Sequence, residues 1–178
     1  MVQRGNNKKR NGQSLVEVMV AITALTVSFL GISALLAQSL AISRSTTDEL
    51  TATYLASEGV EITKNLIDHD VYAGNPWGTC LFSQNLNADV EVDHATADCT
   101  TLAAFSGEPL YYHSDTHLYD YDSNGGTATI FTRDIKVAHP QPYEITVASI
   151  VQWPSLGGNL QSIDLRDDFY SWNATTTP

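Results

Sequence analysis

The sequence predicts an α+β protein: a long N-terminal α-helix, with a membrane half and an amphipathic half, packed by a C-terminal antiparallel β-sheet of about four strands. Residues 14–70 contain no proline and carry apolar residues at helical spacing. Residues 109–165 instead combine short alternating stretches with Gly, Asn, Asp and Pro turns, which is typical of β-hairpins. We therefore expect one helix from about residue 14 to 68 and a sheet that covers its amphipathic half.

The first half of the helix, residues 13–40, is predicted to cross a membrane. From Leu15 to Ala37 the chain is apolar apart from small hydroxyl residues and Glu17. Such a helix is roughly 35 Å long, enough for the hydrocarbon core of a bilayer. Residues 1–12 contain four basic residues and no acidic one, which predicts a cytoplasmic N-terminus and an outer C-terminal part. A signal anchor or a secretory signal peptide has the same general pattern.

Three details favour a narrower interpretation. The apolar run exceeds the roughly 7–15 residues of a signal-peptide core. Gly12 precedes the run, where a signal peptide has its small residues after it. Glu17 lies inside the run, where a lone carboxylate costs about 2.5–3.5 kcal/mol on insertion scales. Cleavage after Gly12 would create an ammonium group on Gln13, a suitable partner for Glu17 of a neighbouring subunit.

A basic leader that ends in Gly, followed by an apolar helix with Glu at the fifth mature position, resembles the signal of the type IV prepilin and pseudopilin family. The matching residues are Gly12, Gln13, Ser14, Leu15, Val16 and Glu17. The resemblance covers about the first 60 residues; the later strands look only generally like those of minor pilins. Two positions depart from the pattern: Gln13 replaces the usual Phe, and residues 31–34 lack the Pro found in many members.

The resemblance implies a structural protein and no enzyme. It implies that a prepilin peptidase cleaves after Gly12 and methylates the amine of Gln13, and that Glu17 sets the register between subunits. The implied partners are other pilin subunits in a homo- or hetero-filament, the peptidase, an inner-membrane assembly platform and the membrane. The protein would be a single-pass membrane protein before assembly and part of an extracellular filament or the cell surface afterwards.

The second half of the helix, residues 41–68, is predicted to be amphipathic. Apolar or small residues recur every three to five positions, and acidic residues and Lys64 lie between them. The recurring positions are Leu50, Tyr54 or Leu55, Gly59, Ile62 and Leu66. Residues 45–48 also fit the cap of a second helix, so a break or kink there stays open.

The charge of the chain argues against nucleic-acid binding. The leader, residues 1–12, carries four of the nine basic residues and none of the twenty acidic ones. Five basic and twenty acidic residues therefore remain after cleavage, a formal charge of −15. Because a polyanion repels phosphate backbones, we expect no nucleic-acid partner.

Residues 69–108 are predicted to form a loop region held by a disulfide, with one strand at 89–93. The turn formers in 74–78 end the helix. Cys80 and Cys99 both lie on the predicted outer side, where disulfides persist, and a loop of this length contributes roughly 3 kcal/mol in the chain-entropy model. Two free buried thiols are the alternative, and a zinc site lacks a nearby pair of histidines.

Residues 109–178 are predicted to form the sheet and a C-terminal tail. The expected strands are 110–113, 118–121, 128–137, 144–153 and 160–165, with turns at 122–126 and 154–159 and an end of the third strand at Pro140 and Pro142. The tail, 172–178, has no clear pattern.

One turn resembles half of a calcium-binding loop. Asp120, Asp122 and Asn124, followed by Gly125, match D-x-D-x-N-G, but Phe131 stands where such a loop has its bidentate Glu. A polar hairpin turn prefers the same residues, so no cofactor is expected and calcium is only a candidate. His113 and His117, with Asp115 between them, are a still weaker metal candidate, and no catalytic motif occurs.

The favoured function is therefore a structural subunit of a type IV pilus-like extracellular filament. A minor pseudopilin of a type II secretion or DNA-uptake machine shares the signal and stays open. A secreted or membrane-anchored binding or hydrolytic domain, cleaved after Ala41 by an ordinary signal peptidase, is the alternative from another class. The N-terminus of the mature protein, Gln13 or Ile42, separates the last hypothesis from the first two.

Overall fold

A computed structural model describes residues 11–83 and 89–171 and has the predicted α+β fold. The elements, in chain order, are α1 (Asn11–Tyr72), α2 (Thr79–Ser83), β1 (Asp89–Glu91), a 3-10 helix η1 (Cys99–Thr101), β2 (Ala103–Ala104), β3 (Tyr111–His113), β4 (Leu118–Asp120), β5 (Thr127–Ala128), β6 (Thr132–Gln141), β7 (Glu144–Pro154) and β8 (Leu160–Tyr170). The chain divides into two compact units at Arg44 and Ser45. The backbone of 45–48, where a second cap was possible, is helical.

The first unit presents an apolar helical surface. Large apolar side chains of 15–42 are more than half exposed, and the most apolar window of the helix has no buried residue. The helix is long and apolar enough to cross a membrane. The hydroxyls of Thr23, Thr26 and Ser28 donate to carbonyl oxygens three or four residues earlier. These polar groups are therefore satisfied within the helix and suit lipid or another helix.

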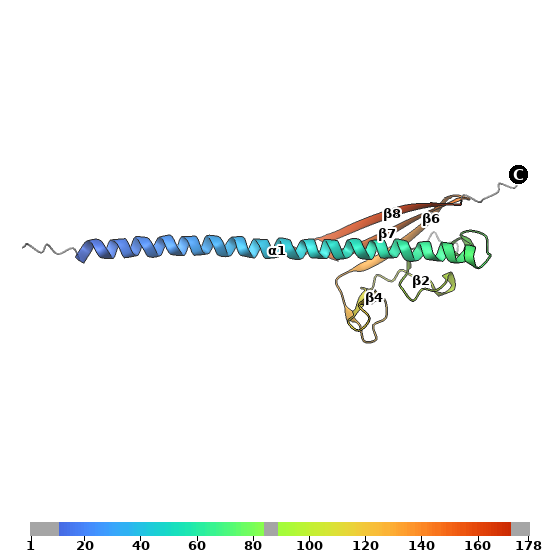
Figure 1. Ribbon diagram of the computed structural model, residues 1–178, viewed down its shortest axis with the longest axis horizontal. Helices are drawn as coiled ribbons and strands as arrows, with labels where there is room; N and C mark the ends of the chain where they lie inside the picture. Colours follow the sequence, from blue (N-terminus) through green and yellow to red (C-terminus); the bar gives the residue numbers. More distant parts are fainter. Residues whose placement is uncertain (1–10, 84–88, 172–178) are drawn as a thin grey trace, which may run out of the picture. The chain divides into compact units, whose positions relative to one another are not determined.

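The second unit is built around a five-stranded antiparallel sheet, in the order β2-β1-β6-β7-β8. In Figure 1, β6, β7 and β8, drawn in orange to red, run beside the green part of α1. The buried residues of β7 alternate over most of the strand, and α1 packs on that face. One core cluster centres on Val60, Ile67, Ile135 and Ile145, and a second joins Leu55 to other apolar residues.

The stripe on α1 differs from the prediction in one respect. Leu55 and Leu66 are buried, whereas Leu50 and Tyr54 are 54% and 68% exposed. The sequence allowed either Tyr54 or Leu55 in the apolar stripe. In the structure, Leu55 is the one buried against the sheet. Leu50 and Tyr54 thus form an apolar surface outside the core.

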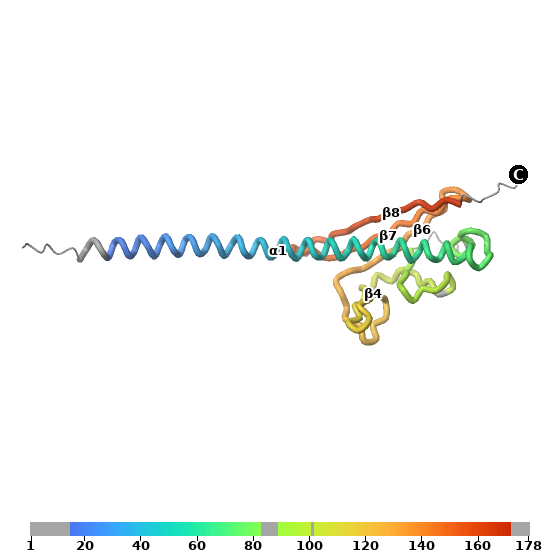
Figure 2. The backbone as a smooth tube through the Cα atoms, viewed as in Figure 1, coloured from blue at the N-terminus to red at the C-terminus, as the bar shows by residue number. Residues whose placement is uncertain are grey.

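The sheet is larger than the four strands predicted, and the first strands of 109–178 do not belong to it. β3, β4 and β5 form a separate sheet in the order β4-β3-β5, whereas β1 and β2 from the loop region extend the main sheet. In Figure 2 the yellow and light-orange tube around β4 forms this second sheet, before the chain enters β6. The predicted strand 128–137 is divided between β5 and β6.

Two strands also run further than predicted. β6 continues past Pro140 to Gln141. The pairing with β7 shifts register between Ala138 and Gln141. Proline, which has no backbone N–H to donate, is tolerated at such an irregularity. β8 extends to Tyr170, paired along its length with β7.

A buried arginine on the main sheet links that sheet to the helix. Arg133, on β6, is fully buried, and its Nη1 donates to Glu58 Oε2 at 2.9 Å and to the Leu55 carbonyl oxygen at 3.1 Å. Its Nη2 donates to the carbonyl oxygen of Val92. The hydroxyl of Tyr121 donates to the Arg133 carbonyl oxygen, and burial raises the pKa of Tyr121 to about 12. One side chain therefore ties together residues far apart in the sequence.

Candidate functional site

The N-terminal site predicted from the sequence lies at the start of α1. Gly12 and Gln13 belong to the first turns of the helix by their backbone, and their side chains lie outside the described residues. Glu17 follows one helical turn after Gln13. The leader that precedes Asn11 also lies outside the described residues.

Glu17 is the one acidic residue of the exposed apolar surface. Its side chain is exposed, between apolar neighbours such as Val16 and Val18 that are themselves more than half exposed. Within residues 11–83 and 89–171, no cation lies within ion-pair distance of its carboxylate. A carboxylate in this position can accept hydrogen bonds from a cation of another chain, and burying it without one is costly.

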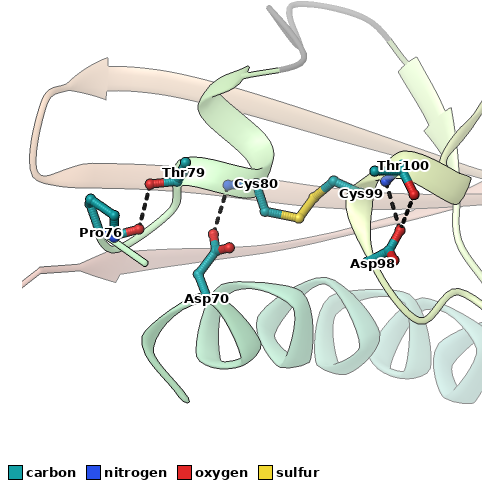
Figure 3. Close-up of a disulfide and its surroundings, with 7 residues drawn as sticks. All are labelled: Asp70, Pro76, Thr79, Cys80, Asp98, Cys99 and Thr100. Atoms are coloured by element: carbon teal, nitrogen blue, oxygen red, sulfur yellow. Dashed lines mark hydrogen bonds between the residues drawn. A yellow bond between two sulfur atoms is a disulfide. The ribbon is translucent and has the colours of Figure 1, made fainter. Parts of the chain in front are cut away.

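The disulfide predicted between Cys80 and Cys99 is present. It joins α2 to η1 with a Cα–Cα distance of 5.4 Å, and Cys99 is 4% exposed. Figure 3 shows Asp70 at the end of α1 beneath it: Asp70 Oδ2 accepts the backbone N–H of Cys80 at 2.7 Å. Sequence reasoning missed Asp70, since nothing local marks a carboxylate that bonds ten residues away.

Asp98 supports the other end of the same disulfide. It precedes η1, and its Oδ1 accepts the backbone N–H of Thr100 at 2.8 Å. Asp is a preferred N-cap residue, so the sequence does contain a local signal for this role of Asp98. The disulfide thus connects two local structures that each have their own carboxylate anchor.

The structure places the three residues of the calcium candidate in one turn. Asp120 Oδ1 accepts from the backbone N–H of Asp122 at 2.9 Å and lies 3.0 Å from His113 Nε2. Asp122 Oδ1 accepts from the backbone and side-chain N–H groups of Asn124, and these bonds lower the pKa of Asp122. No group of three or more His, Cys, Asp or Glu suited to a metal occurs among the described residues. Calcium binding remains a prediction.

The two histidines near this turn have different partners. His113 Nε2 lies 3.1 Å from the carbonyl oxygen of Asp122, whereas His117 Nδ1 lies 2.9 Å from the hydroxyl of Tyr112. His117 has a positive φ of 61°, in the left-handed region that Asn, Asp and His enter more readily than most side chains. Both rings therefore lie within hydrogen-bond distance of groups in or next to the small sheet.

Comparison with known proteins identifies one feature of the chain. Residues 7–33 match the family model described as the prokaryotic N-terminal methylation motif. The match contains Gly12, Gln13 and Glu17, the residues singled out above. No curated protein and no solved structure matches the chain.

Proposed function

Because residues 7–33 carry the N-terminal methylation motif, which is the signal of type IV prepilins and pseudopilins, we propose that this chain is a structural subunit of a type IV pilus-like extracellular filament. The motif is the observation that carries the proposal. The exposed apolar helix of 15–42 supports it, since a surface of this kind needs lipid before assembly and other helices afterwards.

Processing begins at Gly12. A prepilin peptidase cleaves the peptide bond between Gly12 and Gln13 and methylates the new amine. The basic leader holds the N-terminus on the cytoplasmic side, so the second unit lies outside the membrane. Gly12 leaves room for the peptidase next to the scissile bond, which a branched side chain would fill.

Assembly then pairs two charges that each membrane helix carries at a cost. The ammonium of Gln13 on one subunit approaches Glu17 of a neighbour, so that the carboxylate enters the helix bundle with a cation. Small residues such as Gly31 and Ser33 let the helices approach closely. Other pilin subunits and an inner-membrane assembly platform are the partners.

A pseudopilin of a secretion or DNA-uptake machine is a second candidate, because pseudopilins carry the same motif. The two roles differ in their product, since a pilus extends from the cell surface and can be sheared from it. Recovery of the chain in the sheared filament fraction supports the pilus. Retention in the envelope, with correct processing, supports the pseudopilus.

The mass and N-terminal sequence of the mature protein test the proposal. We expect a protein that begins at Gln13 and carries one methyl group. Methylation also hinders cyclisation of an N-terminal Gln, which would abolish the positive charge. A start at Ile42 would instead show an ordinary signal peptidase, and loss of ammonia from Gln13 in assembled protein would contradict the Gln13–Glu17 pairing.

A processing variant supplies the control. Gly12→Val should leave the full-length precursor in the membrane fraction, because the peptidase has no room for the branched side chain. Mature protein of normal size from this variant would contradict cleavage after Gly12.

A further inference from the structure

We infer that a groove on the second unit receives the guanidinium group of Arg44 from a second copy of this chain, an inference that rests on the filament role proposed above. The groove is open and has a volume of about 350 Å³. Its lining residues are Thr51, Tyr54, Leu55 and Glu58 on α1 and Tyr119 on β4.

The walls of the groove suit a planar cation. Tyr54, 68% exposed, and Tyr119 contribute aromatic rings, and the faces of such rings attract guanidinium groups. Leu55 adds an apolar wall. Arg is better suited than Lys to this environment, because its guanidinium is planar and more weakly hydrated.

Glu58 supplies a carboxylate for the cation. Its side chain is 31% exposed, and only Oε2 is used by Arg133. Oε1 accepts no hydrogen bond from any residue in the described ranges 11–83 and 89–171. A carboxylate has about four acceptor sites, so Glu58 can hold a second guanidinium without releasing Arg133.

Arg44 is the one Lys or Arg of residues 11–83 and 89–171 without a carboxylate within ion-pair distance. Five basic residues remain after cleavage at Gly12. Four of them lie within 4.0 Å of an Asp or Glu oxygen: Lys64, Arg133, Lys136 and Arg166. Arg44 is exposed and makes no ion pair with any residue that the structure describes.

The overall charge explains why the cation of one copy should meet the carboxylate of another. Each mature chain carries a formal charge of −15, so neighbouring copies repel one another. A cation–carboxylate contact between copies offsets part of this repulsion. Arg44 follows directly after the exposed apolar stretch 15–42, the surface that copies bury against each other in the filament. The inferred contact requires that assembly bring Arg44 towards the second unit of a neighbour.

Charge reversal in the full-length chain, expressed with its own assembly machinery, tests the inference. Arg44→Glu should lower the fraction of subunit in sheared filaments about tenfold relative to wild type, because a carboxylate would face Glu58. Arg44→Lys should retain an intermediate fraction. The matched control is Lys64→Glu, an equal charge change at a cation that already pairs with Glu61 within its own chain. Equal losses for Arg44→Glu and Lys64→Glu would overturn the inference, since net charge alone would explain them.

Crosslinking tests the contact directly. One tagged copy keeps Arg44 and carries Ser45→Cys at the exposed position beside it, a co-expressed copy carries Thr51→Cys, and filaments are treated with a short bismaleimide. We expect a crosslinked dimer containing both copies. The control partner is Thr53→Cys, an exposed threonine outside the groove whose hydroxyl, like that of Thr51, bonds the carbonyl four residues earlier. Absence of the dimer from assembled filaments, or an equal yield with the control, would overturn the inference.

The two proposals fail in different ways. If wild-type subunit never enters sheared filaments, the filament role fails, and this inference fails with it. If wild type and Arg44→Glu enter filaments equally, the filament role stands and only the contact is wrong. If Arg44 instead contacts lipid headgroups, Arg44→Glu lowers the amount of inserted subunit and the crosslink to Thr51→Cys is absent, which also overturns the inference.

Discussion

Gly59 is the position where α1 leaves no room for a side chain against the sheet. A Cβ there would lie 2.6 Å from both Ile135 Cδ1 and Ser149 Oγ, two buried atoms on β6 and β7. The glycine is needed for this close approach, and its conformation is helical.

We expect Gly59→Ala to destabilise the second unit by about 2 kcal/mol, because the fully buried side chains of Ile135 and Ser149 must shift to admit the methyl group. Thermal unfolding of the full chain in detergent, followed by circular dichroism, measures this. Gly31→Ala is the control, since a Cβ at Gly31 meets nothing within 4 Å. Equal midpoints for both variants would contradict the steric explanation.

At the scale of elements, the small sheet β4-β3-β5 contains a titratable contact. His113 on β3 faces the Asp122 carbonyl oxygen and the Asp120 carboxylate, with Asp115 nearby. The hydrogen bond to the Asp122 carbonyl, and then the charge of Asp120, raise the pKa of His113 above its ordinary value of 6.5. Its protonated form is therefore favoured in the folded sheet.

This direction gives the sign of the pH dependence. Since the folded pKa is raised, the contribution of His113 is fully present below about pH 6.5 and is lost as the pH rises through the folded value. His113→Gln keeps a side-chain donor but does not titrate. The unfolding midpoint of wild type should exceed that of His113→Gln at pH 5.5, and the difference should shrink towards pH 8.5. A constant difference across this range would contradict the role of the charge.

At the scale of the whole molecule, the proposed pairing of Glu17 with the Gln13 ammonium of a neighbour would make insertion and assembly place opposite demands on Glu17. Glu17→Val removes a carboxylate that costs about 2.5–3.5 kcal/mol in a bilayer, so membrane insertion should be retained or improved. Incorporation into filaments should fall, because the neighbour's Gln13 ammonium loses its partner. Immunoblots of membrane and sheared fractions measure both, and N-terminal sequencing verifies processing. Full incorporation of correctly processed Glu17→Val would count against the assembly role.

Local pattern was sufficient for the features that depend on neighbours in the sequence. The long helix follows from composition and apolar spacing, and the methylation motif matched at 7–33 contains Gly12 and Glu17, whose roles stay predictions. The Cys80–Cys99 disulfide was also predictable, because the chain has only two cysteines. Most strand positions were predicted within a few residues, whereas one sheet was predicted and the strands form two.

Tertiary structure alone decided which strands pair and which polar groups are buried. Arg133 contacts Leu55 and Val92, which are 78 and 41 positions away, so no local pattern marks it as the buried link between the helix and the main sheet. Leu55 is buried in the core, whereas Leu50 and Tyr54 are exposed. Tyr54, together with Glu58 and Tyr119, lines a groove. Sequence spacing determines which face a residue occupies on its own element. Which element covers that face depends on contacts whose partners are separated by long loops, and it is therefore settled only when the chain packs.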